Sequence, residues 1–194
     1  MAKEIIGVGT VANDGTGDNF RASMVKANNN FTELYLKKSG FLDYNDAATA
    51  ITPISVTGGG GFIYLTNDGL GSFTNKTYPP SGVNDVWDSS TNAFDFSELN
   101  LGSVIHYRID LNITTTAANQ EVNIQIELAI GANVYSLSVA QKQYKTAGTY
   151  PAVFANFIYI GDSNTLDNPG KFKISSPNNA TVVVNGWVCD INLY

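Results

Sequence analysis

Four carboxylates that could support catalysis lie close together in the sequence: Asp85, Asp88, Asp95 and Glu98. Two carboxylates held at a fixed separation are what glycoside hydrolysis requires. These four fall in a stretch without clear helix or strand periodicity, so the sequence does not place any two of them at that separation. The sequence therefore gives no specific indication of a hydrolase.

The other reactive side chains also favour structural roles. A single histidine, His106, and a single cysteine, Cys189, argue against a His- or Cys-based metal site and against a disulfide within one chain. His106 lies beside Arg108 and Asp110 on the polar face of an expected strand, where a cross-strand hydrogen bond is the simpler role. Cys189 occurs at strand spacing and is expected to pack in the core. We expect no enzymatic activity, no metal and no cofactor.

The composition is that of a globular protein. The chain has 194 residues, of which 43% are hydrophobic and 14% are charged, enough for one domain and a small appendage. Its net charge of −6 argues against binding to nucleic acid, which needs a basic patch. Neither a signal peptide nor a segment of transmembrane length is present, so we expect synthesis in a cytoplasm and no insertion into a membrane.

The stretch from Asn13 to Tyr35 has the clearest local pattern. A Gly-rich turn is followed by apolar residues at steps of 4, 3, 4 and 3, which form a heptad seam: Phe20, Met24, Ala27, Phe31 and Leu34. Asp18 stands where an N-cap belongs and Gly40 supplies a stop, so the pattern predicts a helix over 19–38. Asp14 and Asp18 lack the spacing of a calcium loop, which favours capping. A helix of this length is marginal alone, so its seam needs a partner.

The same stretch resembles an attachment segment found near the N-terminus of many bacteriophage virion proteins. The matching residues are Asn13–Asp18, Arg21, Asn30, Phe31, Glu33, Leu34 and Tyr35, whereas Asn19 replaces a common Pro and Ala27 a larger apolar residue. The resemblance implies that residues 1–40 bind another virion protein, in the capsid or in the tail. The attachment and seam residues that we expect are Asn13, Asp14, Asp18, Phe20, Met24, Phe31, Leu34 and Tyr35.

After this segment the chain changes to the two-residue periodicity of half-buried strands. The clearest alternation covers 104–113 and 121–130. Further strands are expected at 134–141, 152–160, 171–175 and 181–193, with weaker ones at 54–57, 62–66 and 94–101. Short strands separated by turns are typical of an antiparallel sandwich. We therefore predict a linker at 41–53 and a β-sandwich domain at 54–194.

Two of these strands, 152–160 and 181–193, carry apolar or aromatic residues on both faces. Such a strand in a small sandwich needs a second cover, which a neighbouring subunit can provide. In strand number, aromatic strand and final strand, the domain is similar to the tumour-necrosis-factor-like jelly rolls. That resemblance implies a mainly β, antiparallel jelly-roll trimer whose last strand is central in the sheet that faces the threefold axis. The expected trimer contacts are Phe157, Tyr159, Trp187, Ile191 and Tyr194.

The stretch 67–92 is long for a loop and combines aromatic, amide and acidic side chains, as carbohydrate- and protein-binding loops often do. Its candidate receptor-binding residues are Tyr78, Asp85, Trp87 and Asp88. The alternative is that Trp87 pins the loop to the sandwich.

Together the two resemblances predict a non-enzymatic structural protein of the phage virion, made in the cytoplasm of the bacterial host. We expect a homotrimeric head or tail fibre, or a capsid decoration protein. It would dock by its N-terminus and present its jelly roll to a glycan or protein of the host surface. The alternative is a decoration or baseplate component that stabilises the particle without binding a receptor. A depolymerising enzyme would need paired acids in a rigid groove, which the sequence does not show.

Overall fold

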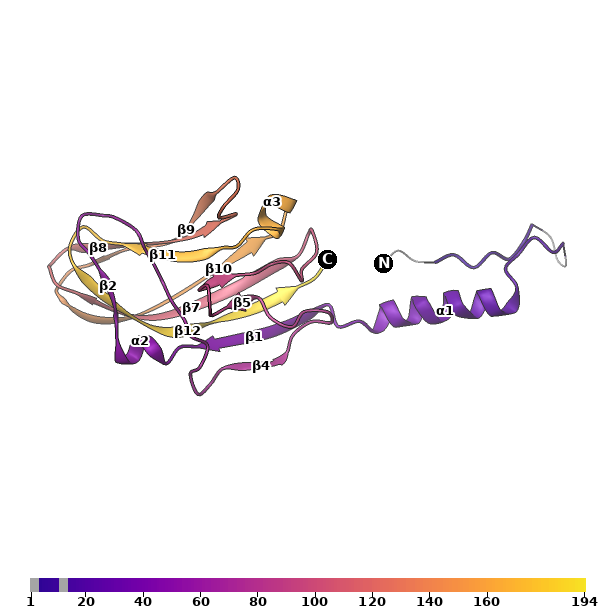
Figure 1. The fold of residues 1–194 in the computed structure, drawn as a ribbon, viewed down its shortest axis with the longest axis horizontal. Coiled ribbons are helices and arrows are strands. Elements are labelled where there is room, and N and C mark those ends of the chain that lie inside the picture. The colour runs from indigo at the N-terminus through magenta and orange to yellow at the C-terminus, as the bar shows by residue number, and fades with distance from the viewer. Residues whose placement is uncertain (1–3, 11–13) are drawn as a thin grey trace. The chain divides into compact units, whose positions relative to one another are not determined.

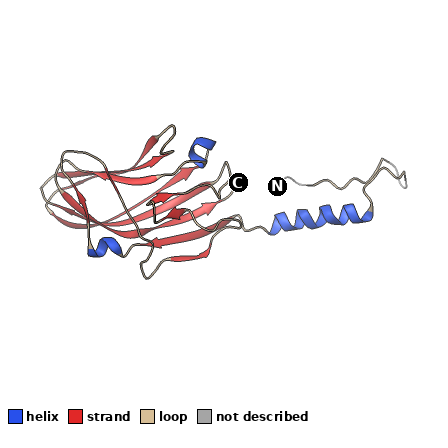
Figure 2. Ribbon diagram, in the orientation of Figure 1, coloured by secondary structure: helices blue, strands red, loops and turns tan. Residues whose placement is uncertain are grey.

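The computed structural model describes residues 4–10 and 14–194 (Figure 1). Asn13 of the predicted attachment motif lies outside the described residues. The chain forms two compact units, residues 1–37 and 38–194. The first holds the helix α1 and the second holds the strands, as Figure 2 shows. Among the described residues, none of the helices has the length and apolar character that a membrane crossing requires.

The helix α1 spans Phe20–Tyr35, within the predicted range but shorter at both ends. Its N-cap is Asn19, whose side chain accepts a hydrogen bond from the Ala22 N–H at 2.8 Å. The prediction that Asp18 is the N-cap was therefore wrong by one residue. The helix ends because Leu36 takes an extended conformation, with ψ 126°, before the chain reaches the predicted stop at Gly40.

The second unit is built from two antiparallel sheets. Sheet A has the order β10–β7–β12–β1–β4, with β2 also paired to β12. Its strands are β1 Ser39–Asn45, β2 Ile54–Val56, β4 Asn75–Tyr78, β7 Val104–Thr115, β10 Gly148–Tyr159 and β12 Ala180–Asn192. Sheet B has the order β3–β11–β8–β9, formed by β3 Ile63–Tyr64, β8 Gln120–Leu128, β9 Tyr135–Tyr144 and β11 Lys171–Ser175. A small hairpin, β5 Trp87–Asp88 with β6 Ala93–Phe94, and two short helices, α2 Ala48–Ile51 and α3 Ser163–Leu166, complete the unit.

The strand order is that of a jelly roll. Strands from opposite ends of the chain lie side by side, as β1 with β12 and β3 with β11, and successive strands pass between the two sheets. This interleaving of two Greek keys defines the fold. The predicted antiparallel jelly-roll sandwich is confirmed, and the last strand, β12, is central in sheet A, between β7 and β1.

The predicted linker at 41–53 was wrong, because most of it is structured. β1 pairs along its whole length with β12, from Ser39 opposite Asn192 to Asn45 opposite Gly186. Gly40 belongs to this strand, at a point where the backbone at the end of β4 lies very close to it. A Cβ at Gly40 would lie 2.3 Å from the Tyr78 carbonyl oxygen. The sandwich therefore begins at β1 and not at residue 54.

A bulge in β12 decides which of its residues enter the core. The register with β7 shifts between Val184 and Gly186, so the inward positions change from even to odd numbers along the strand. Val182 and Val184 are buried before the bulge, and Trp187, Cys189 and Ile191 are buried after it. The strand looked apolar on both faces because the bulge divides its sequence into two halves of opposite phase.

Two predicted trimer contacts are consequently core residues. Trp187 and Ile191 are both 0% exposed. The Trp187 ring packs edge-on against Trp87, with centroids 4.5 Å apart, and against Phe172 at 5.3 Å. These two residues cannot face another subunit while the sandwich is folded, so their assignment to the trimer interface was wrong.

Candidate functional site

The outward face of sheet A carries several exposed apolar side chains. The strand register places its residues in rows across four strands. One row is Phe157, His106, Asp190 and Phe41, and the next is Ala155, Arg108, Val188 and Asp43. Val153, Phe157 and Tyr159 on β10 and Phe41 on β1 are each more than half exposed. We call this surface, with its two rows and the outward residues of β10, the sheet A face.

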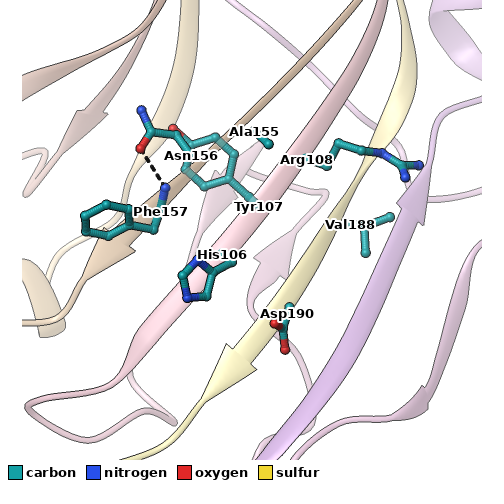
Figure 3. A pocket seen from close by; sticks show the side chains of 8 residues that line it. All are labelled: His106, Tyr107, Arg108, Ala155, Asn156, Phe157, Val188 and Asp190. Atoms are coloured by element: carbon teal, nitrogen blue, oxygen red, sulfur yellow. Dashed lines mark hydrogen bonds between the residues drawn. The ribbon is translucent and has the colours of Figure 1, made fainter.

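A depression of about 370 Å³ lies in the centre of the sheet A face (Figure 3). It is lined by His106, Tyr107, Arg108, Ala155, Asn156, Phe157, Val188 and Asp190. The His106 ring packs against Phe157 with centroids 6.0 Å apart. The backbone N–H of Phe157 donates to the Asn156 side-chain oxygen at 2.9 Å, as the dashed line in Figure 3 marks. The walls are mainly apolar, with charged groups of both signs on one side.

The charges of the sheet A face are partly paired within it. The Arg108 guanidinium donates from Nη2 and Nε to one oxygen of Asp110, at 2.9 and 3.1 Å. Partial burial raises the pKa of Asp43, and Asp110 adds to that rise while Arg108 opposes it. The residues form neither a carboxylate pair nor a nucleophile with its base. This chemistry suits contact with another macromolecule.

The predicted trimer contacts that remain are at the surface. Phe157 and Tyr159 lie on the sheet A face, and the C-terminal residue Tyr194 is also exposed. The outward positions of Phe157 and Tyr159 follow from the alternation of β10, because Ala152 and Ile158 on the other side of the strand are buried. The sequence analysis missed Phe41, whose outward position follows from the alternation of β1, with Leu42 and Tyr44 buried on either side of Asp43.

The first unit is organised by polar side chains that hold the N-terminal arm, residues 4–10, against α1. The side chain of Asn30 accepts from the Glu4 N–H and donates to the Glu4 carbonyl, both at 2.9 Å. Asp18 accepts from the Gly7 N–H at 2.8 Å and from Lys26 Nζ at 2.7 Å, and Lys26 also donates to the Ile5 carbonyl at 3.0 Å. The arm therefore runs back alongside α1 (Figure 1).

The other aspartate of the motif with a described position, Asp14, shapes the turn between arm and helix. Asp14 accepts from the N–H and hydroxyl of Thr10, both at 2.7 Å, and from the Thr16 N–H at 2.9 Å. Asp18, by contrast, serves the contact with the arm, and its hydrogen bonds from Lys26 and from the Gly7 N–H lower its pKa. The polar residues of the attachment motif thus serve the internal structure of the unit. Lys26 and Asn30 were not singled out from the sequence for this role, because only the folded arm shows what they bind.

The apolar residues of the first unit are at its surface. None of the described residues of α1 is buried, and the seam residues Phe20, Met24, Phe31 and Leu34 are all exposed, as is Tyr35. In the arm, Ile5 and Val8 are 78% and 88% exposed. The internal contact of this unit is polar and its surface is apolar, which is the reverse of a globular domain.

Comparison with known proteins identifies no family for this chain. No protein-family model and no curated protein matches the sequence. Among solved structures, the chain is similar to a chain of infectious bursal disease virus strain Gx, with 11% identity over 81% of this chain and 33% of that chain and a TM-score of 0.43. It therefore spans a third of the length of that chain.

Two further likenesses cover most of both chains. One is to the Eiger TNF from S. frugiperda, with 7% identity over 82% of this chain and 94% of that chain and a TM-score of 0.40. The other is to the vertex protein P5 of PRD1, with 10% identity over 82% of this chain and 99% of that chain and a TM-score of 0.34. At such identities and TM-scores we base no functional argument on these likenesses.

The predicted receptor-binding loop does not form an aromatic platform. Trp87 is buried, and its ring N–H donates to the Asn67 carbonyl at 3.0 Å, so it pins the loop to the sandwich, as the alternative interpretation held. Tyr78 is exposed, but it lies opposite Phe41, at the end of β1 where the chain enters the sandwich.

The acids of the same loop are occupied by local hydrogen bonds. Partial burial alone would raise the pKa of Asp85, but hydrogen bonds from Lys76 and Tyr44, each at 2.5 Å, outweigh it and lower that pKa. Hydrogen bonds from Ser90 and Thr91 lower the pKa of Asp88 to about 2. The other two acids lie after the loop and also accept hydrogen bonds: Asp95 from the Ser97 N–H, two residues later, and Glu98 from the Asn84 side chain in the loop. Within residues 4–10 and 14–194, no group of three or more His, Cys, Asp or Glu side chains is placed to hold a metal ion.

Proposed function

We propose that this protein is a non-enzymatic structural component of a phage virion, a homotrimeric head or tail fibre or capsid decoration protein. Residues 1–40 would dock on another virion protein, and the jelly roll would carry loops that contact a glycan or protein of the host surface. The proposal rests on the resemblance of the N-terminal motif to phage attachment segments and on the two apolar surfaces described above.

The observation that carries the trimer is the sheet A face. Phe41, Val153, Phe157 and Tyr159 are exposed on one continuous sheet, although the other side of that sheet is a complete core. Val153, Phe157 and Tyr159 form an apolar stripe along β10, and Phe41 lies across the sheet beyond His106 and Asp190. Exposed aromatic side chains beside charged residues are typical of a protein–protein interface. In a trimer, one part of this face packs against a different part of the same face in the next copy, a heterologous contact that closes into a ring after three subunits.

The trimer is tested by the native mass of the full-length protein, measured by light scattering. One chain has a mass of 20.8 kDa, so a trimer of three chains has a mass of about 62 kDa. We expect the wild-type protein to have the trimer mass and Phe157→Asp to be monomeric, because a charge buried at the interface would have no partner. A matched control is Phe73→Asp, at an 80% exposed phenylalanine outside the sheet A face, which should remain trimeric.

A monomeric wild-type protein, or a Phe157→Asp variant with the trimer mass, would refute the interface. Circular dichroism of the variant distinguishes loss of assembly from loss of folding, since Phe157 is not a core residue.

The second candidate function is a decoration or baseplate component without a receptor. It is favoured by one observation, namely that three of the four predicted receptor-binding residues are occupied, because Trp87 is buried and Asp85 and Asp88 accept local hydrogen bonds, whereas Tyr78 is exposed. Binding of the fluorescently labelled full-length trimer to intact cells of the propagating strain separates the two functions. Saturable binding supports adhesion, and its absence supports the purely structural role.

A further inference from the structure

The described residues of the first unit form no apolar core. Its arm is joined to α1 through Asp18, Lys26 and Asn30, and its described apolar side chains are left at the surface. A helix of 16 residues is marginal in water without tertiary contacts. The hydrogen bonds to the arm are also partly exposed, where each contributes little. The unit therefore needs apolar contacts from outside itself.

The seam specifies what kind of partner supplies them. Its residues recur at steps of 4 and 3, so the stripe stays on one side of α1 over the whole helix. On a helix of 3.6 residues per turn, Lys26, Asn29 and Asn30 project to one flank of this stripe, and these are the residues that hold the arm. The folded arm thus leaves the seam open along its length. A heptad stripe fits the holes between residues of another heptad helix better than it fits an irregular surface.

We infer that the partner of the α1 seam is the α1 seam of two further copies of this chain, packed parallel and in register, with the arms on the outside. The inference rests on the trimer of the proposed function. In a trimer with threefold symmetry, the three copies of Ser39 lie at one level along the axis, because the rotation does not reverse the direction of the chain. Only residues 36–38 separate α1 from β1, so the three helices end close to that level, and the same symmetry makes them run in the same direction.

The inference assigns the two exposed surfaces of the first unit to different partners. The seam residues Phe20, Met24, Phe31 and Leu34 form the three-chain core. Contact with the particle then falls to the outer arm, where Ile5 and Val8 remain exposed after the seams close.

Disulfide cross-linking in the full-length protein tests this arrangement. In a parallel, in-register seam, a residue meets its own counterpart, so Met24→Cys and Leu34→Cys should each give covalent dimers when oxidised with copper–phenanthroline. The matched control is Thr32→Cys, which is exposed near Leu34 in the sequence but on the opposite side of α1. The wild-type Cys189 is fully buried and should give no cross-link.

We expect dimer bands from both seam variants at least tenfold stronger than from Thr32→Cys. If neither seam variant cross-links, or if Thr32→Cys cross-links as strongly, the inference is wrong. An antiparallel seam would also overturn it, since residue 34 would then lie opposite residue 20 and neither variant could react with itself.

The native mass, measured on the same samples, separates this inference from the proposed function. Protein of trimer mass that fails to cross-link overturns the seam arrangement and leaves the trimer standing. Protein of monomer mass overturns both. A further variant, Val8→Asp, should leave cross-linking of Leu34→Cys unchanged and lower incorporation into particles at least tenfold. Unchanged incorporation would refute the role of the arm.

Discussion

At the scale of single residues, Gly186 has the widest effect on the sandwich. It has φ of 150° at the bulge of β12, and a Cβ there would lie 2.4 Å from the Tyr44 carbonyl oxygen. Because the backbone of β1 lies so close to β12 at this point, position 186 requires glycine. The bulge in turn aims Trp187 between Trp87 and Phe172, so one residue without a side chain positions the largest aromatic cluster of the core.

We predict that Gly186→Ala destabilises the second unit by about 3 kcal/mol, because the new methyl group meets backbone that cannot move without breaking the β1–β12 pairing. The measurement is thermal or denaturant unfolding followed by tryptophan fluorescence. Gly61→Ala is the matched control, since a Cβ at Gly61 meets nothing within 4 Å. Equal stability of the two variants would contradict this account of the bulge.

The same residue explains a limit of sequence reasoning. Trp187 and Ile191 were assigned to the trimer interface because their strand carries apolar residues on both faces, which suggested that a second subunit covers it. The shift at Gly186 reverses the phase, and a glycine inside a strand pattern was the available signal. Trp87 was placed correctly only by the alternative interpretation, because the sequence does not show that its ring N–H reaches Asn67.

At the scale of elements, long strands were the most predictable. β7 and β8 cover the predicted 104–113 and 121–130 with small differences at their ends, and β11 has the predicted bounds 171–175. β1 was missed because its pattern is short, has a glycine at its second position and is interrupted by the charged Asp43. Its pairing with β12 is a contact between distant parts of the chain, which local periodicity does not contain.

The contact between the arm and α1 should depend on pH through Asp18. The pKa of Asp18 is lowered from its ordinary value of 3.8 by Lys26 and the Gly7 N–H, so its contribution is present above that value and is lost as the pH falls through the lower, folded pKa. We predict that the amide resonance of Gly7 moves to its unfolded position on acidification below pH 3.8. In Asp18→Asn this titration should disappear, and a wild-type resonance that does not move would show that the carboxylate does not hold the arm.

At the scale of the whole molecule, the boundary between the units lies earlier than the sequence suggested. The predicted sandwich began at residue 54, whereas β1 at Ser39–Asn45 occupies a place in sheet A between β12 and β4. The jelly-roll architecture was predictable from strand number and alternation. Its first strand was not, and neither were the positions of the residues that the bulge in β12 turns inward.

We predict that a fragment of residues 38–194 is soluble and folded, and that a fragment of residues 46–194 is insoluble or unfolds at least 15 °C lower. The shorter fragment loses β1, exposing one side of β12 and removing the buried Leu42 and Tyr44. Circular dichroism melting of the two fragments makes the comparison. Equal melting temperatures would mean that β1 is dispensable, contrary to its central place in sheet A.

The division between Lys37 and Lys38 also has a consequence for inheritance. It falls after the last residue of α1 and before the first of β1, so a genetic crossover there interrupts no helix, strand or hydrogen-bonded turn of either unit. Recombination at this point could therefore join the N-terminal unit of one chain to the second unit of another with both units intact. Under the proposed function, such an exchange would give a particle a new outer domain while it keeps its own attachment unit.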